Sequence, residues 1–307
     1  TGISVTTSPL KVTIAANPTP IVCKNAPVTL TANTVGNPLL TYLWSPNGET
    51  TQSIAPSTAV TGSVLYSVTV TDVNENTATD NVTVTVNEPS ATITGTTTIC
   101  QNQSPLPLIT FTGAGGTAPY IFTYTYNGGA NITTSQSIGN TITIDAVAGT
   151  PGTDKYDLIS VSDANTCSQN QNGEVIVTID PSSIGGTISG STSICSGTNS
   201  TLLTLSGQTG AVIKWQYSIN GGTSWTDISN TGTTFTATNL NITTDFRAVI
   251  QNGICPSATS AAATIIVTPA SIGGSVTGGT IVCSAINSTT LTLSGQTGAV
   301  IKWQYST

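Results

Sequence analysis

The six cysteines of this 307-residue chain are the residues with the most predictable chemistry. They lie at positions 23, 100, 167, 195, 255 and 283. Regular spacing without any C-x-x-C motif or histidine favours disulfides over a zinc site, and disulfides persist in oxidising compartments outside the cytosol. The spacing predicts one structural bridge from Cys100 to Cys167. A second is predicted from Cys195 to Cys255, and each would close a loop of ~60 residues.

Two cysteines are left over by this pairing, and we expect both to be unpaired in this segment. Cys283 would have its partner ~60 residues later, past Thr307. Cys23 has no partner because Asn76 takes the place of the second cysteine when TDVNENT is aligned with SDANTCS. Cys23 is then either a buried free thiol or an intermolecular link.

Other reactive groups are sparse. The absence of histidine excludes Ser-His-Asp and Cys-His arrangements and histidine ligands for metals. The close carboxylates are Asp154 with Asp157 and Asp72 with Glu75, and both sets fall at predicted turns. Asp72 and Asp163 each begin an Asp-x-Asn turn, where the side chain usually caps its own backbone, although Ca²⁺ binding there is an alternative. We therefore expect no catalytic, cofactor-binding or metal-binding residues, no cofactor and no enzyme activity.

The four tryptophans could form a platform for stacking sugars, but their positions favour packing. Trp215 and Trp303 recur at one repeat position on an alternating strand, which predicts a core role. Trp225 ends the segment SINGGTSW, which resembles the Asp-box hairpin with Asn220 in place of the aspartate. This pattern predicts a hairpin and no binding site.

Charge and hydropathy narrow the range of partners. The net charge is −7 and the six basic residues are scattered, so no cationic surface for nucleic acid is expected. No apolar run approaches the ~20 residues of a membrane span. The chain has no methionine, and we expect it to be part of a longer extracellular protein.

Internal repetition is the strongest pattern in the sequence. Residues 183–218 and 271–306 are identical at 27 of 36 positions without a gap. Weaker copies precede them, each introduced by a Val-rich strand that runs into Pro9, Pro89, Pro181 or Pro269. Because proline closes strands and stiffens short connectors, these positions predict domain junctions. The expected parts are the last strand of a preceding domain (1–8), three complete domains (9–88, 89–180 and 181–268) and the first half of another repeat (269–307).

The pattern of the third repeat predicts about seven short strands in ~88 residues, and no window of the chain has a sustained helical periodicity. In the third repeat, Asn220-Gly221-Gly222 predicts a hairpin between strands that carry Trp215 and Trp225. The predicted fold is all-β, a tandem array of immunoglobulin-like or PKD-like β-sandwiches with almost no helix. Short proline linkers would make the array a semi-rigid rod. The half repeat at 269–307 is expected to leave open strand edges and a bare apolar face.

Three segments carry a family resemblance: GQTGAVIKWQYSINGGTSWTDI (207–228), the SICSGTNS opening, and the strand pair YSVTVTDVNENTATDNVTVTV (66–86). They resemble the repeats of SprB-type gliding adhesins of flavobacteria and related modules of type IX secretion substrates in Bacteroidetes. The resemblance covers nearly the whole chain. Two features depart from the family: the first repeat lacks its second cysteine, and these residues contain no C-terminal sorting domain.

The resemblance implies export by type IX secretion and display at the cell surface as an outer-membrane-anchored filament. Such a filament attaches to an external surface or polysaccharide and takes part in gliding, with outer-membrane secretion or motility machinery as a further partner. Two alternatives stay open. The repeats could be accessory, glycan-binding modules of a large secreted enzyme, or a docking segment of a secretion or motility complex.

Overall fold

The computed structural model describes residues 9–36 and 39–307, and their regular structure consists of 27 strands with no helix. The expected strand at 1–8 lies outside the described residues. The chain divides into two compact units. One contains the described residues up to Thr97 with Ser104–Val147 and Thr153–Thr178, and the other contains Thr98–Gln103, Ala148–Gly152 and Ile179–Thr307.

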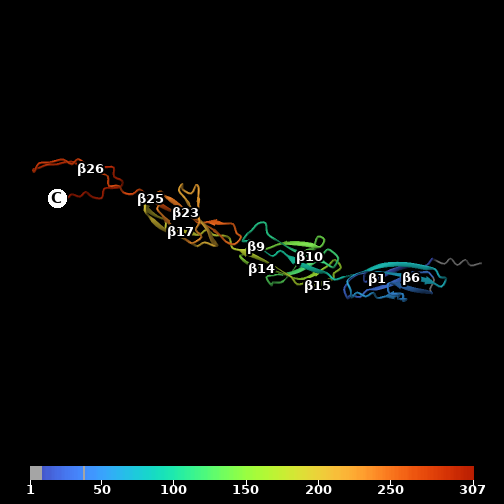
Figure 1. Ribbon diagram of the computed structural model, residues 1–307. Coiled ribbons are helices and arrows are strands. Elements are labelled where there is room, and N and C mark those ends of the chain that lie inside the picture. Colours follow the sequence, from blue (N-terminus) through green and yellow to red (C-terminus); the bar gives the residue numbers. More distant parts are fainter. Residues whose placement is uncertain (1–8, 37–38) are drawn as a thin grey trace, which may run out of the picture. The chain divides into compact units, whose positions relative to one another are not determined.

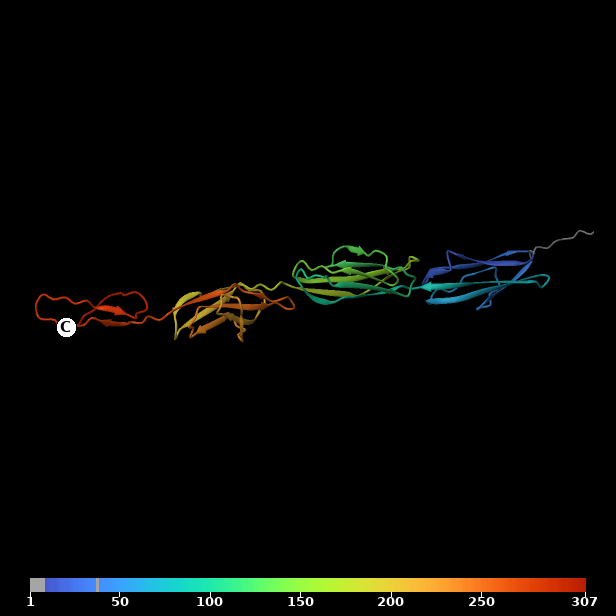
Figure 2. The same cartoon turned by 90° about the horizontal axis from the view of Figure 1, so that it is seen from above.

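The first unit begins with two sheets that pack face to face, seen as the two layers of the blue part of Figure 2. One sheet has the order β1-β3-β5 and the other has the order β2-β7-β6-β4. Alternate side chains of β6, such as Val68 and Val70, point inward against Leu30 of β3 and surround the buried Trp44. The strands are β1 (Lys11–Asn17), β2 (Ile21–Cys23), β3 (Thr29–Val35), β4 (Leu40–Ser45), β5 (Ser53–Ile54), β6 (Gly62–Asp72) and β7 (Thr77–Asn87).

The next sheets have the orders β13-β10-β8 and β12-β11-β14-β16-β9, and β15 also pairs with β14. An aromatic cluster fills the space between them: the ring centroid of Phe111 lies 5.5 Å from that of Phe122 and 5.2 Å from that of Tyr124. The strands are β8 (Ser90–Thr94), β9 (Thr97–Cys100), β10 (Leu108–Ala114), β11 (Ile121–Tyr126), β12 (Asn131–Thr133), β13 (Thr141–Asp145), β14 (Gly152–Ser162), β15 (Ser168–Asn170) and β16 (Glu174–Asp180).

The second unit contains a third pair of sheets, with the orders β17-β19-β22 and β18-β25-β23-β20-β21, and β24 pairs with β23. Trp215 is fully buried at its centre, as expected, and packs against Phe235 with ring centroids 5.8 Å apart. The strands are β17 (Thr187–Ser189), β18 (Thr192–Cys195), β19 (Ser200–Ser206), β20 (Ala211–Ser218), β21 (Thr226–Ile228), β22 (Thr234–Thr238), β23 (Thr244–Gln251), β24 (Ala258–Thr259) and β25 (Ala263–Thr268).

These paired sheets with alternating inward side chains are immunoglobulin-like β-sandwiches in tandem along the chain. The predicted hairpin of the third sandwich is confirmed, because β20 pairs antiparallel with β21 across Asn220. Asn220 Oδ1 accepts hydrogen bonds from the Ser218 hydroxyl (2.8 Å) and the Ser224 backbone N–H (3.0 Å). The asparagine therefore closes the turn in the manner expected of the aspartate it replaces.

The last segment holds two strands, β26 (Ser275–Thr277) and β27 (Thr292–Ser294), and its ribbon is red in Figure 1, where β26 is labelled. Val276 pairs with Leu293 in the register in which Ile188 pairs with Leu205, so the repeat is retained in the strand pairing. The expected bare apolar face is confirmed, since Val300 is 49% exposed whereas its equivalent in the third sandwich, Val212, is buried. The expectation that Trp303 is a core residue is wrong for this structure. Its side chain is 54% exposed because no strand equivalent to β23 covers it among the described residues.

The two ends of each sandwich carry different elements. We call the end where its last strand leaves the exit end, and the opposite end, where its first strand begins, the entry end. A short strand carries a cysteine to each exit end. Cys23 of β2 lies opposite Asn87 of β7 in a parallel pair, and Cys195 of β18 lies opposite Thr268 of β25 in the same way. Cys100 ends β9, which neighbours β16.

Candidate functional site: two cross-linked junctions

The first disulfide joins the exit end of the first sandwich to the entry end of the second. It links Cys23 to Cys167, with Cα atoms 5.2 Å apart and a sequence separation of 144. Cys167 lies in the turn between β14 and β15 and is 1% exposed. Beside the bridge, the Glu88 N–H donates to the Gly115 carbonyl (3.0 Å), so the backbone leaving the first sandwich is tied to the second within one residue of its last strand.

A buried polar cluster completes this junction. The side-chain amide of Asn87, at the end of β7, donates to Asp163 Oδ2 (2.7 Å) and to the Thr117 hydroxyl (3.0 Å). Asp163 Oδ2 also accepts from the Thr117 N–H (3.0 Å), and its Oδ1 accepts from the Cys167 N–H (2.9 Å). A buried carboxylate is tolerated only with such partners. The Asp163 side chain therefore stabilises the turn that carries Cys167 and also accepts a hydrogen bond from Asn87, the last residue of β7 in the preceding sandwich.

The second disulfide repeats the arrangement one sandwich later. It links Cys100 to Cys255, with Cα atoms 4.9 Å apart and a sequence separation of 155. Gln101 N–H donates to the Asp180 carbonyl (2.8 Å), which places Cys100 beside the last residue of β16. Cys255 is fully buried in the turn after β23, and its N–H donates to the Asn252 carbonyl (2.9 Å).

At the second junction the carboxylate and the side-chain amide lie on the opposite sides from those at the first junction. The carboxylate now belongs to the exit residue, Asp180, whose Oδ2 accepts from the Ile254 N–H (3.3 Å). The amide belongs to the turn: Asn252 Nδ2 donates to the Pro181 carbonyl (2.7 Å). Gly253 has a φ of +49°, and a Cβ there would collide with the Asp180 carboxylate. Each junction thus combines one disulfide, one carboxylate and one side-chain amide, with the carboxylate on opposite sides.

This pairing corrects the sequence prediction. The expected bridges Cys100–Cys167 and Cys195–Cys255 are absent; Cys100, Cys167 and Cys255 are cross-linked with other partners, and the leftover Cys23 is paired. Cys195 and Cys283 are free and exposed. The reason is geometric. Cysteines of one repeat lie at opposite ends of its sandwich, roughly the 20 Å length of a strand apart, whereas a disulfide needs Cα atoms within about 7 Å.

One signal in the sequence pointed to the correct pairing. The first repeat has an exit cysteine, Cys23, but no turn cysteine, and pairing within repeats leaves it over. Pairing each exit cysteine with the turn cysteine of the following repeat uses Cys23, Cys100, Cys167 and Cys255 without remainder. In the chain-entropy model each bridge, taken alone, stabilises its sandwiches by about 5 kcal/mol. This exceeds the stabilisation by a bridge within one repeat, because the loops are more than twice as long.

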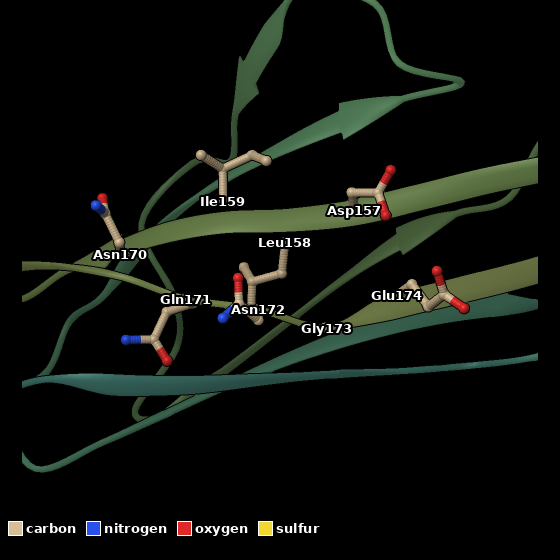
Figure 3. Close-up of a pocket in the computed structure, with 8 residues that line it drawn as sticks. All are labelled: Asp157, Leu158, Ile159, Asn170, Gln171, Asn172, Gly173 and Glu174. Carbon is tan, nitrogen blue, oxygen red and sulfur yellow. The ribbon is translucent and has the colours of Figure 1, made fainter.

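An open hollow of about 540 Å³ lies over β14 and the segment before β16 (Figure 3). It is lined by Asp157, Leu158, Ile159, Asn170, Gln171, Asn172, Gly173 and Glu174, with the two carboxylates on one side and the three amides on the other. Lys155 Nζ contacts both Asp157 (2.9 Å) and Glu174 (3.0 Å). These carboxylates raise the pKa of Lys155 by hydrogen bonding and charge, so a lysine cation stands between them. This arrangement does not provide the unequal carboxylate pair of an acid–base site.

The remaining candidates take structural roles. Asp72 Oδ1 accepts from the N–H groups of Asn74 (2.9 Å) and Asn76 (3.0 Å), which confirms the expected turn cap. Hydrogen bonding from Asn76 lowers the pKa of Asp72. The Arg247 guanidinium lies 4.1 Å from the ring centroid of Trp225, a cation–π contact that covers one ring face.

Metal-binding clusters and membrane-spanning helices are two further kinds of functional element. Among residues 9–36 and 39–307, no group of three or more Cys, Asp or Glu side chains could hold a metal ion. In the same residues, no helix has the length and hydropathy of a membrane span.

Comparisons with known proteins give one family match. Residues 184–269 match the family described as "Domain of unknown function (DUF8696)". This segment corresponds to the third sandwich and is under a third of the chain. No curated protein matches.

Several solved structures are similar at low identity. A bacterial ice-binding adhesin of 1.5 MDa, studied for host cell surface retention, is 16% identical over 85% of this chain and 99% of that one, with a TM-score of 0.44. An I-band fragment from titin is 8% identical over 86% and 99%, with a TM-score of 0.46. A tetra-tandem repeat from the extending region of a large adhesion protein is 14% identical over 84% and 74%, with a TM-score of 0.30. Neither the fold nor the function stated for this chain depends on these similarities.

Proposed function

We propose that this chain is a repeat segment of a large cell-surface adhesin, with no enzyme activity of its own. The observation that carries the proposal is the pair of disulfides that join consecutive sandwiches. A bridge between domains holds neighbours in series, which serves a protein that spans distance or bears load. Bridges of this kind also require an oxidising compartment outside the cytosol.

The finer proposal rests on the family resemblance. The repeats, with boundaries at 9–88, 89–180 and 181–268, form part of an outer-membrane-anchored filament that is exported by type IX secretion. The filament attaches the cell to an external surface or polysaccharide and takes part in gliding. The low charge and the Thr-rich strand surfaces support an extended, weakly charged spacer whose contacts are made by loops at the sandwich ends.

The direct test uses an antibody raised against this chain on intact cells of the source organism. Labelling of unpermeabilised cells, lost after deletion of the gene or of the secretion machinery, is expected. Electron microscopy should then show surface fibres that disappear in the deletion strain, together with reduced attachment and spreading. Labelling only after permeabilisation, or unchanged fibres and attachment, would refute the proposal.

The alternative of glycan-binding accessory modules is less well supported. Sugar-stacking sites need exposed aromatic faces, but Trp44 and Trp215 are buried and Trp225 carries the Arg247 guanidinium on one face. The exposed tryptophan, Trp303, lies in the half repeat. The hollow over β14 offers amides without an aromatic ring. Glycan-array binding by the isolated chain, together with a catalytic domain in the same gene, would favour this alternative.

A further inference from the structure

The two disulfides overlap along the chain. In sequence order the bridged cysteines are Cys23, Cys100, Cys167 and Cys255, and the first pairs with the third while the second pairs with the fourth. The two covalent loops therefore share residues 100–167. The overlap arises because, in the second sandwich, the exit cysteine Cys100 precedes the turn cysteine Cys167 in sequence. Cys100 pairs with a cysteine of the following sandwich, and Cys167 pairs with a cysteine of the preceding one.

This connectivity limits how far the chain can be extended. The backbone from Cys23 to Cys255 runs through about 232 residues, taken as the difference of the two positions. With both bridges, the shortest covalent route crosses from Cys23 to Cys167, runs back through about 67 residues to Cys100 and crosses to Cys255. A taut chain can be no longer than its shortest covalent route.

We infer that the interlaced bridges are a redundant extension limiter: either bridge alone caps the length of the array when its sandwiches are pulled open. The inference goes beyond adhesion, because it concerns the response of the chain to force and not what the chain binds. At about 3.5 Å per extended residue, the capped segment reaches roughly 230 Å, and the uncapped segment reaches roughly 810 Å. An opened sandwich then stays near its partner strands, which favours refolding because loop closure is less costly for shorter loops.

Redundancy distinguishes these interlaced bridges from two bridges that would each limit a separate segment of the chain. Without the first bridge, a route of about 77 residues from Cys23 to Cys100 remains, longer than the native route by about 10 residues or roughly 35 Å. Without the second bridge, a route of about 88 residues from Cys167 to Cys255 remains, longer by about 21 residues or roughly 75 Å. Removing both releases about 165 residues relative to the native chain, or roughly 580 Å. The extended length gained when both bridges are removed is therefore far larger than the sum of the lengths gained when each is removed alone.

The test is single-molecule force spectroscopy on the 307-residue chain, held by handles at its ends and stretched to full extension. Four proteins are compared: the native chain, Cys23→Ala/Cys167→Ala, Cys100→Ala/Cys255→Ala, and the variant with all four substitutions. Cys195→Ala is the matched control and should leave the length unchanged, since Cys195 is free. The fully extended length depends on which cysteines are bridged, so the remaining bridge of each paired variant is first verified by peptide mapping under non-reducing conditions.

The expected result is a gain of less than about 100 Å in each paired variant, with a gain of roughly 580 Å only in the fourfold variant or after reduction and alkylation of the native chain. A native chain as long as the fourfold variant would overturn the inference. So would a gain of more than about 150 Å in either paired variant. Failure of these measurements would leave the adhesin proposal standing, because its tests are made on cells.

Limited proteolysis gives an independent test of the disulfide pairing. Any single backbone cut between Cys23 and Cys255 leaves the two fragments joined by at least one bridge. A chain cleaved once by trypsin after Lys24 should run as one species on a non-reducing gel and as two fragments after reduction, whereas bridges within repeats would release residues 1–24 without reductant. Separation of the fragments without reductant would contradict the interlaced pairing.

Discussion

The polar cluster at the first junction makes a quantitative prediction about Asn87. Its amide donates two hydrogen bonds, to the Asp163 carboxylate at 2.7 Å and to the Thr117 hydroxyl at 3.0 Å, and both Asn87 and Asp163 are 6% exposed. Substitution by alanine deprives a buried carboxylate of one of its donors. A hydrogen bond to a charged group contributes about 1.5–3 kcal/mol, and Asp163 keeps three backbone donors, so we expect Asn87→Ala to weaken the junction by about 2 kcal/mol.

The assay is the rate at which dithiothreitol reduces each bridge under native conditions, followed by alkylation and peptide mass spectrometry. Cys167 is buried and Cys23 is half-buried, so reduction is expected to be fastest when the junction opens. A loss of about 2 kcal/mol raises the open population about 30-fold, and the Cys23–Cys167 bridge should be reduced faster by that factor. The Cys100–Cys255 bridge in the same molecule is the internal control and should keep its rate.

A second control is Asn172→Ala. Asn172 is an exposed asparagine that makes no side-chain hydrogen bond within the described residues, and its substitution should change neither rate. Equal acceleration of both bridges by Asn87→Ala would mean that the variant loosens the whole protein. An unchanged rate at Cys23–Cys167 would refute the role assigned to the Asn87–Asp163 contact.

Three further outcomes are expected. Trp215→Ala should lower the unfolding free energy of the third sandwich by about 3–5 kcal/mol in urea denaturation, because the ring is fully buried, whereas Trp303→Ala at the same repeat position should change it by less than about 0.5 kcal/mol. Gly253→Ala should accelerate reduction of Cys100–Cys255 selectively, since the added Cβ collides with Asp180; an unaltered rate would show that the turn has room. The pKa of Asp72 is lowered in the folded state. The stabilising effect of its carboxylate is therefore present above the usual pKa near 3.8 and is lost as the pH falls through the lowered pKa of the folded state. In thermal melts, Asp72→Ala should lose less stability at acid pH than the native chain, and identical pH profiles would contradict the cap.

Local features of the fold could be predicted because they depend on neighbours in sequence. Alternation along Val68 and Val70 defines one buried face of β6 whatever lies opposite. The hairpin at Asn220 and the turn cap at Asp72 are closed by hydrogen bonds within a few residues. Such features need no knowledge of how sandwiches meet.

The disulfide pairing could not be predicted from spacing alone. Similar separations of ~60 residues favoured pairing within repeats. The exit strand, however, carries Cys100 to one end of its sandwich, and the β14–β15 turn carries Cys167 to the other. The distance between two cysteines of one repeat is set by the length of the strands between those ends. The exchanged positions of carboxylate and amide, Asn87 with Asp163 and then Asp180 with Asn252, are visible only once the junctions are assembled.

The sequence by itself determined the repeat, the strands, the tight turns and the absence of histidine chemistry, since each of these is written in local patterns or composition. Only the tertiary structure decided which thiols meet, because that depends on which ends of two sandwiches come together. Cys23, left over in sequence, becomes half of a bridge because a neighbouring sandwich supplies its partner.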